Sequence, residues 1–525
     1  MAQLHVATQI CFSGCVSDDG EWESRPSEAG PVVVIPYADF TYFGLLLYAV
    51  VPTLILGVFG RAGWRWALFV TAVVLIIQYQ GLLNIRSDFP VREIWIIIGF
   101  AAWQWATVRA FASAGARGAW LFYATVGASL LPLAATKFLP VISPGSQFGF
   151  LGISYITFRA LDIVFCLRDK VISVPGTVDL FMFLFFFPTT SSGPIDRYRR
   201  FASDWRKTRT RAEFLVDLDG AVHRIFRGFF YKFILAALIK QYWLDRAASS
   251  GSFGALLSYM YAYSLYLFFD FAGYSAFAIA LSYVFGVHTP ENFDRPFLAR
   301  NIRDFWNRWH ITLSFWFRDH VYMRFLLAAT RGQWFANKHT AAILGYFLAF
   351  GLMGLWHGIE PHYIVYGLYQ GILLSAFHIF STWDKKHRYR PDGLLSRALA
   401  VFLTFNFVCF GLLIFSGRIG APPLSHHAGE VELVACYGIS GWAWDKYQPN
   451  TKVNVDLWDG EHYLMAIPAN QFRQDLADAG YGNGQHGFRI ATPLLVKDGH
   501  SHEIHFRIAG TKQELTNSPQ VIACP

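Results

Sequence analysis

The chain has 525 residues, 54% of them hydrophobic and 18% aromatic, and its 44 basic and 36 acidic side chains give a net charge of +8. This apolar excess exceeds that of ordinary soluble domains and excludes a purely soluble globular protein. The basic residues gather in short loops between apolar runs, a pattern typical of membrane topology, so we expect no nucleic-acid partner.

The first segment, residues 1–36, is a mostly polar N-terminal extension that contains Cys11 and Cys15. It has no basic stretch followed by an apolar core, so we expect no cleavable signal peptide there. The first apolar run begins near Asp39 and is long enough to serve as an uncleaved signal anchor. The extension itself has no assigned role.

Eleven apolar runs follow, at about 39–59, 66–83, 93–112, 118–139, 147–166, 177–191, 221–243, 255–286, 340–356, 361–381 and 395–416. About 20 apolar residues cross a bilayer, so we predict an all-α polytopic membrane domain over residues 37–420 with about ten spans. The short run 177–191, which contains Pro188, is interpreted as re-entrant. This choice puts the basic loops in the cytoplasm and both termini outside, whereas one more span would put the first three loops outside.

The most polar part of this domain is NIRDFWNRWHITLSFWFRDHVYMRF, residues 301–325. Five ionised side chains facing lipid at mid-bilayer would cost on the order of 12–17 kcal/mol, so the stretch must lie inside protein, at the interface or beside a watery cavity. These five are Arg303, Asp304, Arg308, Arg318 and Asp319. Asp304 and Arg308 are four residues apart and are expected to pair. A continuous helix would also align a polar seam on one face: Arg303, Asn307, His310, Ser314 and Phe317.

A second polar group occurs in GLMGLWHGIEPHY, residues 351–363. Its glycines, Gly351, Gly354 and Gly358, are expected to let helix backbones pack closely in the membrane. His357 lies beside Trp356 at the end of an apolar helix. A lone membrane histidine is often a hydrogen-bonded packing residue, but two such residues, His310 and His357, favour a functional site.

Metal and serine chemistry have little support in the sequence. No H-E-x-x-H, C-x-x-C or G-x-S-x-G motif occurs. Gly273-Tyr274-Ser275 begins like G-x-S-x-G but lacks its final glycine. We therefore expect no metal site and no bound cofactor. A buried neutral imidazole suits removal of a proton from a hydroxyl that attacks an activated acyl group, although composition alone does not separate this from a proton-coupled transporter.

Several motifs resemble the membrane-bound O-acyltransferase family. They are FWNRWH at 305–310, SFWFRD at 314–319 and GLWHG at 354–358. Four more resemble the branch of the family that transfers D-alanyl groups, over the alginate O-acetylase branch: FP at 187–188, SGPIDRYRRF at 192–201, FDFAGYS at 269–275 and NFDRPF at 292–297. The resemblance covers about residues 37–416.

The resemblance implies a ring of helices with a thin centre and a tunnel between the two membrane faces. His357 would be the catalytic histidine and His310 a second polar residue that faces the tunnel. Further substrate or tunnel positions would be Asn307, Ser314, Arg303, Asp304, Arg308, Trp306, Trp309, Trp356, Arg318 and Asp319. The implied reaction moves a D-alanyl group from a phosphopantetheine thioester, carried by a cytosolic carrier protein, to hydroxyls of an envelope polymer such as a teichoic acid or another glycan. O-acetylation of an exopolysaccharide stays open, as does a transporter, although no inverted repeat is visible.

The stretch from Ser192 to Arg211 carries seven basic residues. It is expected to lie against anionic lipid as a topology determinant, and it can also bind an acidic cytosolic protein. The residues predicted to contact the acidic carrier are Arg197, Arg199, Arg200 and Arg295, with Arg300 and residues 331–338 adding positive surface. The expected location is the cytoplasmic (inner) membrane.

After Pro422-Pro423 the composition becomes that of a soluble domain, and residues 424–525 are predicted to form a small β-sandwich-like module outside the cytoplasm. Strands are predicted at 430–437, 440–445, 452–458, 461–467, 486–491 and 501–509, with a helix at 471–480. A Cys436–Cys524 disulfide is possible in that compartment. Trp442, Trp444 and Trp458 are either core residues, which we favour, or a saccharide-stacking surface. The module is hypothesised to hold the acceptor polymer.

Overall fold

The structure is a computed structural model, and most of the chain from Pro36 onward is described. The described ranges are 36–37, 40–80, 92–115, 118–142, 148–191, 193–249, 252–387, 393–420, 427–511 and 513–525. The N-terminal extension with Cys11 and Cys15 lies almost wholly outside them. The chain divides into two compact units, residues 1–244 with 258–421 and residues 245–257 with 422–525, and each is described by itself.

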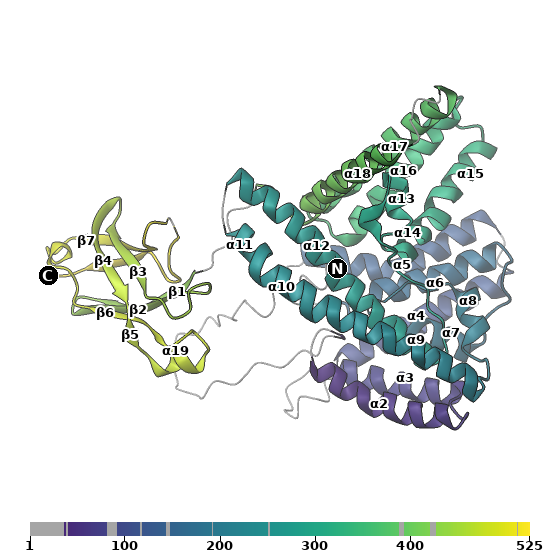
Figure 1. The fold of residues 1–525 in the computed structure, drawn as a ribbon, viewed down its shortest axis with the longest axis horizontal. Coiled ribbons are helices and arrows are strands. Elements are labelled where there is room, and N and C mark those ends of the chain that lie inside the picture. Colours follow the sequence, from purple (N-terminus) through teal and green to yellow (C-terminus); the bar gives the residue numbers. More distant parts are fainter. Residues whose placement is uncertain are drawn as a thin grey trace. The chain divides into compact units, whose positions relative to one another are not determined.

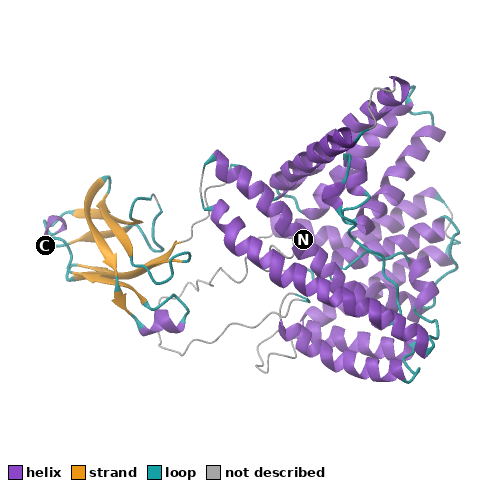
Figure 2. Ribbon diagram, viewed as in Figure 1, coloured by secondary structure: helices purple, strands orange, loops and turns teal. Residues whose placement is uncertain are grey.

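The first unit is built from helices, drawn in purple in Figure 2 and labelled in Figure 1. The N-terminal ones are α2 (Phe40–Val58), α3 (Trp64–Gln80), α4 (Arg92–Ser113), α5 (Ala119–Ile142), α6 (Ile153–Arg168), α7 (Thr177–Phe185), α8 (Tyr198–Asp204) and α9 (Arg211–Phe229). After α10 (Ala237–Ile239) come α12 (Phe253–Val284), α13 (Ile302–Trp306), α14 (Ile311–Phe317), α15 (Met323–Arg331), α16 (Lys338–His357), α17 (Pro361–His387) and α18 (Leu394–Phe415). Helix α11 (Asp245–Ala248) and the first residues of α12 belong to the second unit.

Seven helices in the described part of the chain are long and apolar enough to cross a bilayer. They are α2, α4, α5, α12, α16, α17 and α18. In α12, 78% of the most apolar window is buried, compared with 22–44% in the other six. A helix that is apolar on all sides and enclosed in this way is a core helix, while the other six expose broad apolar faces of the kind that meet lipid.

The sequence predicted about ten spans, and seven helices within the described ranges meet the length and composition of a span. The remaining apolar runs are helical but shorter or interrupted: α3 has 17 residues, α6 has 16, and run 221–243 is divided by two π-helical segments, Phe230–Ala236 and Lys240–Leu244. Helix α7 has 9 residues. It is about 14 Å long, too short for a hydrocarbon layer of about 30 Å, which agrees with the re-entrant interpretation.

A buried arginine accounts for this short helix. Arg159 of α6 is 1% exposed, and its guanidinium donates to the main-chain oxygens of Phe183 (3.1 Å), Leu184 (3.2 Å) and Thr189 (2.5 Å). The last carbonyls of a helix have no partner within it, so a helix that ends inside apolar protein needs donors from elsewhere. Arg159 supplies them, and α7 can end where it does.

The polar stretch 301–325 is not one continuous helix, so the predicted polar seam is wrong. Helix α13 ends at Trp306, and α14 starts after His310, whose φ of 42° is left-handed. The break arises because main-chain groups of this stretch bond to the segment 292–294 and not to the next helical turn. The Ile311 N–H donates to Asn292 O (3.0 Å), and the Asp294 N–H donates to Arg308 O (2.9 Å). The predicted Asp304–Arg308 ion pair is confirmed at 2.8 Å.

The second unit contains two four-stranded antiparallel sheets, ordered β1-β2-β6-β5 and β4-β3-β7-β8 (Figure 2, orange). The strands are β1 (His427–Ala435), β2 (Gly438–Asp445), β3 (Val453–Asp459), β4 (His462–Ala469), β5 (Gln471–Phe472), β6 (Gln485–Ile490), β7 (Ser501–Ile508) and β8 (Gln520–Ala523), with α19 at Gln474–Asp478. One core of aliphatic and Phe side chains from both sheets holds them together. The six predicted strands are confirmed, while β5 and β8 were not predicted.

The Cys436–Cys524 disulfide is present. Trp442, Trp444 and Trp458 are half-buried and lie outside the core cluster, so the interpretation of these tryptophans as core residues is wrong. Trp442 and Trp444 alternate along β2 with the core residues Gly441 and Ala443, so they lie on the opposite face of the sheet, half-buried. Both rings pack against Tyr481, at 4.7 and 5.1 Å between centroids. A side chain at Gly441 would meet the main-chain oxygen of Glu430 in β1 and the Phe488 ring of β6, both in the same sheet.

Candidate functional site

His310 is held at the start of α14 by a fully buried asparagine. The asparagine is Asn292, and its Oδ1 lies 3.1 Å from Nδ1 of His310. The His310 ring contacts the Phe271 ring edge-on, with 4.8 Å between the centroids. The left-handed backbone of His310 is costly for a residue with a side chain, so the surrounding contacts must impose it. Such enforced conformations are frequent at functional sites.

His357 is the last residue of α16 and is 8% exposed. Its ring lies between those of Trp356 (4.5 Å) and Phe415 (4.9 Å), and Lys137 Nζ donates to its main-chain oxygen at 3.1 Å. Within the described part of the chain, His357 Nδ1 has no hydrogen-bond partner. A buried imidazole nitrogen without a hydrogen-bond partner lowers the stability of the fold. A histidine at position 357 is therefore better explained by function than by packing.

The glycines around His357 are explained by the approach of α17. A Cβ at Gly354 would lie 2.4 Å from the main-chain oxygen of Tyr363, and one at Gly358 would lie 2.5 Å from the Tyr363 ring, so both confirm the predicted close packing. Gly351 meets nothing within 4 Å, and the prediction is wrong there.

The two histidines line the same cavity, although 47 residues separate them. The other lining residues are Leu267, Trp306, Trp309, Leu313, Met353, Tyr366, Leu412 and Phe415. The cavity measures about 20 Å³, about the space of one water molecule. Its walls are otherwise mainly apolar, so the two imidazoles and the Tyr366 hydroxyl are the lining side chains with a titratable group.

The predicted tunnel residues are distributed over several environments. Trp306 and Trp309 line the histidine cavity, and Ser314 Oγ donates to Trp309 O at 3.2 Å. Asn307, Arg303 and Arg318 are exposed, Asp304 and Arg308 pair with each other, and Trp356 and Asp319 line a different, larger cavity. The structure therefore brings two of the ten positions into the cavity beside the histidines.

The larger cavity, of about 990 Å³, lies among α5, α6, α14, α15 and α16. Its lining includes Phe158, Trp316 and Trp356, with Lys137 and His320 among the polar residues. A third cavity, of about 670 Å³, is lined by Asn292, Ser275 and Arg295, among others. Both volumes fall in the range of ligand pockets. Asn292 therefore contacts His310 and also borders a cavity of ligand size.

A buried ion-pair cluster was missed by the sequence analysis. Asp162 of α6, 2% exposed, accepts hydrogen bonds from Arg197 Nη1 (2.8 Å) and from the Tyr198 N–H (2.9 Å), and His320 Nε2 lies 2.9 Å from it. Arg197 also reaches Asp319 at 3.1 Å. A single Asp in an apolar run gives little warning of this, because the partner residues come from distant parts of the chain.

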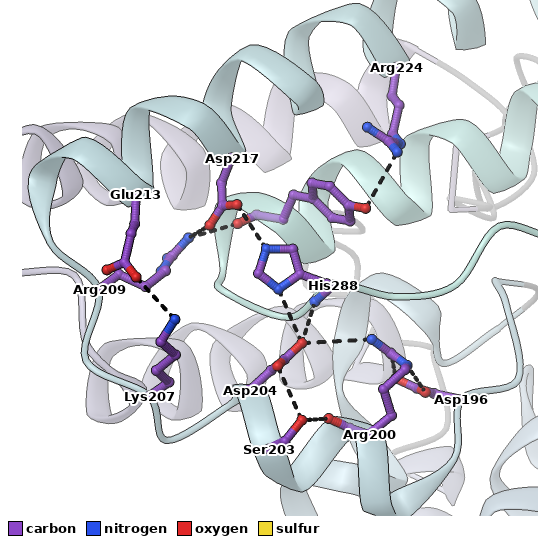
Figure 3. Close-up of polar contacts among 11 residues, drawn as sticks. Asp196, Arg200, Ser203, Asp204, Lys207, Arg209, Glu213, Asp217, Arg224 and His288 are labelled. Carbon is purple, nitrogen blue, oxygen red and sulfur yellow. Dashed lines mark hydrogen bonds and ion pairs between the residues drawn. The ribbon is translucent and has the colours of Figure 1, made fainter.

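The basic stretch 192–211 is largely neutralised by its own surroundings, and the pairs of Arg200, Lys207 and Arg209 are drawn in Figure 3. Arg200 pairs with Asp196, Arg206 with Asp179 (2.7 Å), Lys207 with Glu213 (3.0 Å) and Arg209 with Asp217 (2.9 Å). His288 lies between Asp204 (3.1 Å) and Asp217 (2.8 Å). The free positive surface is therefore smaller than the sequence suggested. Of the four predicted docking residues, Arg199 and Arg295 are exposed and Arg197 and Arg200 are paired.

Over the described ranges, no group of three or more His, Cys, Asp and Glu side chains is arranged to hold a metal ion. The site has two imidazoles in a cavity with otherwise mainly apolar walls. Such an arrangement supports proton transfer to and from a hydroxyl without a fixed charge.

Helices able to span a membrane and two histidines in one cavity fit a membrane acyltransferase. A family model of the membrane-bound O-acyltransferases matches residues 68–416, and the chain belongs to this family. It is a multi-pass membrane protein, and the module from His427 onward lies beyond the matched region.

Among curated proteins, the chain is similar to the teichoic acid D-alanyltransferase of Bacillus subtilis (strain 168), with 41% identity over 405 residues, which is 75% of this chain and 99% of that protein. It is 36% identical to the teichoic acid D-alanyltransferase of Lacticaseibacillus rhamnosus, over 73% of this chain and 97% of that protein. It is also 32% identical to the probable alginate O-acetylase AlgI of Pseudomonas aeruginosa (strain PAO1), over 50% of this chain and 48% of that protein.

Proposed function

We propose that this chain transfers a D-alanyl group from the phosphopantetheine thioester of a carrier protein to hydroxyl groups of a teichoic-acid-like envelope polymer. The observation that carries the proposal is the shared cavity of His310 and His357 in a chain of this family. The 41% identity to a teichoic acid D-alanyltransferase supports the choice of acyl group and acceptor.

In the proposed reaction, a hydroxyl oxygen of the polymer attacks the carbonyl carbon of the thioester. His357 takes the hydroxyl proton as the new C–O bond forms, and it returns that proton to the leaving sulfur when the C–S bond breaks. The thioester supplies the activation, so the chain needs no nucleotide and no cofactor of its own. His310 is the second polar group and holds one of the two substrates.

The proposed setting is the cytoplasmic membrane, with the carrier on the cytosolic side and the polymer outside. The Cys436–Cys524 disulfide supports an extracytoplasmic location for the module, because disulfides persist in oxidising compartments. The module is proposed to keep the acceptor polymer close to the site.

For the carrier, the structure favours a smaller docking surface than the sequence did. The exposed basic residues Arg199, Arg295, Arg300 and Arg331 are proposed to contact an acidic carrier. Arg197 and Arg200 are proposed to stabilise the fold and not to contact the carrier, because each forms an ion pair with a buried carboxylate.

The alternative acyl group is acetyl. The relatives named alginate O-acetylase favour it, but each match covers about half of this chain, whereas the D-alanyltransferase relatives match about three quarters. Membership of an acyltransferase family removes the reason for considering a transporter.

The test uses the full-length chain in liposomes with a carrier protein loaded with labelled D-alanine and, separately, with acetate. We expect transfer of D-alanine to a teichoic acid, and His357→Ala should lower the rate by about 10²–10⁴-fold, the usual contribution of a general base. His378→Ala is the matched control, because His378 bonds to His339 (3.0 Å) away from the cavity. Turnover retained in His357→Ala, or a preference for acetate, would refute the proposal.

A further inference from the structure

The hydrogen bonds around Asn292 form a chain whose direction is determined by main-chain donors. Ile195 N–H donates to Thr312 Oγ1 at 3.0 Å, so the Thr312 hydroxyl must direct its own proton elsewhere. It lies 2.8 Å from Asn292 Oδ1 and donates to it. The Thr312 N–H also points at this oxygen, at 3.4 Å. Since a main-chain N–H can only donate, the amide atom on this side of Asn292 must be the oxygen.

The other end of the amide agrees with this orientation. Asn292 Nδ2 lies 3.3 Å from Ser275 Oγ, a hydroxyl that is able to accept. Asn292 is 0% exposed and Ser275 is 2% exposed, so both residues are buried. Asn292 is further held by its main-chain oxygen, which accepts from the Ile311 N–H at 3.0 Å. The amide oxygen of Asn292 is therefore an acceptor held in place on both sides.

This orientation determines which nitrogen of His310 carries the proton. His310 Nδ1 lies 3.1 Å from the same Asn292 oxygen, and two lone pairs would repel each other at that distance. Nδ1 must be the protonated nitrogen of the neutral ring, which leaves a lone pair on Nε2. His310 lines the cavity that it shares with His357, so it offers that cavity a hydrogen-bond acceptor.

From this chain of bonds we infer that Asn292 is a positioning residue that sets the tautomer of His310, and that His310 binds the acceptor hydroxyl and not the carbonyl oxygen of the thioester. A hydroxyl has a proton to donate to Nε2, whereas a carbonyl oxygen requires an N–H that this tautomer lacks. The inference that His310 binds the acceptor hydroxyl rests on the proposed function. The inference about the tautomer of His310 does not depend on it. The attacking hydroxyl has a single proton, which His357 removes, so the hydroxyl that donates to His310 Nε2 is a second hydroxyl of the same acceptor.

The first experiment measures the tautomer without any substrate. The full-length protein is labelled with ¹⁵N-histidine in lipid nanodiscs, and the His310 signals are identified by comparison with His310→Gln. We expect a neutral ring protonated at Nδ1 in the native protein and a mixed or reversed tautomer in Asn292→Leu. Ser275→Ala is the matched control, because it removes a contact to the amide nitrogen and leaves the oxygen in place. Protonation at Nε2 in the native protein, or an unchanged tautomer in Asn292→Leu, would overturn the inference.

The second experiment separates the two substrates kinetically. Asn292→Leu should raise the KM for the polymer hydroxyl on the order of tenfold, because one hydrogen bond to substrate is lost, and leave the KM for the carrier unchanged. An increase in the carrier KM alone would show that His310 serves the thioester. If the tautomer is as expected but no D-alanyl transfer occurs with any variant, then the proposed function fails and the tautomer assignment stands.

A conservative variant covers the case in which Asn292→Leu does not fold. Asn292→Asp keeps an oxygen opposite Nδ1 and so preserves the tautomer, but its carboxylate favours the protonated ring. Part of the activity should return, and the acidic limb of the pH–rate profile should move to higher pH. A purely structural role for Asn292 would lower activity without moving that limb.

Discussion

Arg159 Nη1 lies 3.1 Å from the main-chain oxygen of Phe183, which joins the middle of α6 to the last turn of α7. Replacing Arg159 with Leu would leave several main-chain carbonyls buried without a donor, each at a cost of about 1–3 kcal/mol. We expect a clear fall in the midpoint of thermal unfolding, measured in detergent by fluorescence-detected size exclusion. Arg168→Leu, at the half-buried end of the same helix, is the control and should change the midpoint little. Equal midpoints for the two variants would contradict the role given to Arg159.

Arg197 and Arg199 should respond differently to substitution, although they are two residues apart. Arg197→Ala leaves the buried Asp162 without its cation, and breaking such a pair costs about 3–5 kcal/mol, so we expect reduced stability and yield. Arg199→Ala removes an exposed charge, so the protein should fold normally and show a higher, salt-dependent KM for the carrier. Unfolding midpoints and carrier titrations at two salt concentrations distinguish these outcomes. A normal midpoint for Arg197→Ala would show that the Asp162 pair is dispensable.

The disulfide should stabilise the β-sheet unit. Cys436 and Cys524 are 88 residues apart, and a cross-link over a loop of this size typically contributes about 2–4 kcal/mol. We expect Cys524→Ser, or reduction, to accelerate limited proteolysis of residues 427–525 while the helical unit stays resistant. Cys166→Ser serves as the control, because Cys166 is a free thiol in α6. Equal proteolysis rates with and without the bond would count against this prediction.

The pairing of β3 with β7 should weaken as the pH rises. Hydrogen bonds to Asp498 and Asp459 raise the pKa of His502 above its usual value of about 6.5. A group whose pKa is raised by folding adds stability that is complete below its unfolded pKa and is lost as the pH rises through the folded pKa. Hydrogen exchange of peptides from 453–459 and 501–508, corrected for intrinsic rates, should show falling protection above about pH 6.5.

His502→Gln should remove most of this pH dependence, whereas His500→Gln should keep it, because the His500 side chain is 81% exposed. The prediction fails if the two variants show the same slope.

Much of the candidate site could be predicted before the structure. His310 and His357 stood out because an imidazole in an apolar helix is rare, and local motifs around each were recognisable. The β strands of the C-terminal module followed from alternation and turn residues. These signals are local, so one sequence contains them.

The errors came from bonds between distant segments. The break in stretch 301–325 depends on Asn292 and its neighbours, which helical periodicity cannot reveal. The tryptophans of β2 were assigned to the core because alternation identifies two faces of a strand without saying which one the opposing sheet covers. The basic stretch looked free for docking because Asp179, Asp196 and Asp217 were not known to lie beside it.

The sequence by itself determined that this is a polytopic membrane protein with a soluble C-terminal module and two chemically competent histidines, because apolar length, composition and residue type are properties of short segments. Only the tertiary structure decided that these histidines share one cavity, that Asn292 orients one of them, that Arg159 is buried against α7 and that Arg197 pairs with the buried Asp162. Those outcomes depend on desolvation and on hydrogen bonds between residues far apart in the chain, and such contacts exist only once the helices have packed.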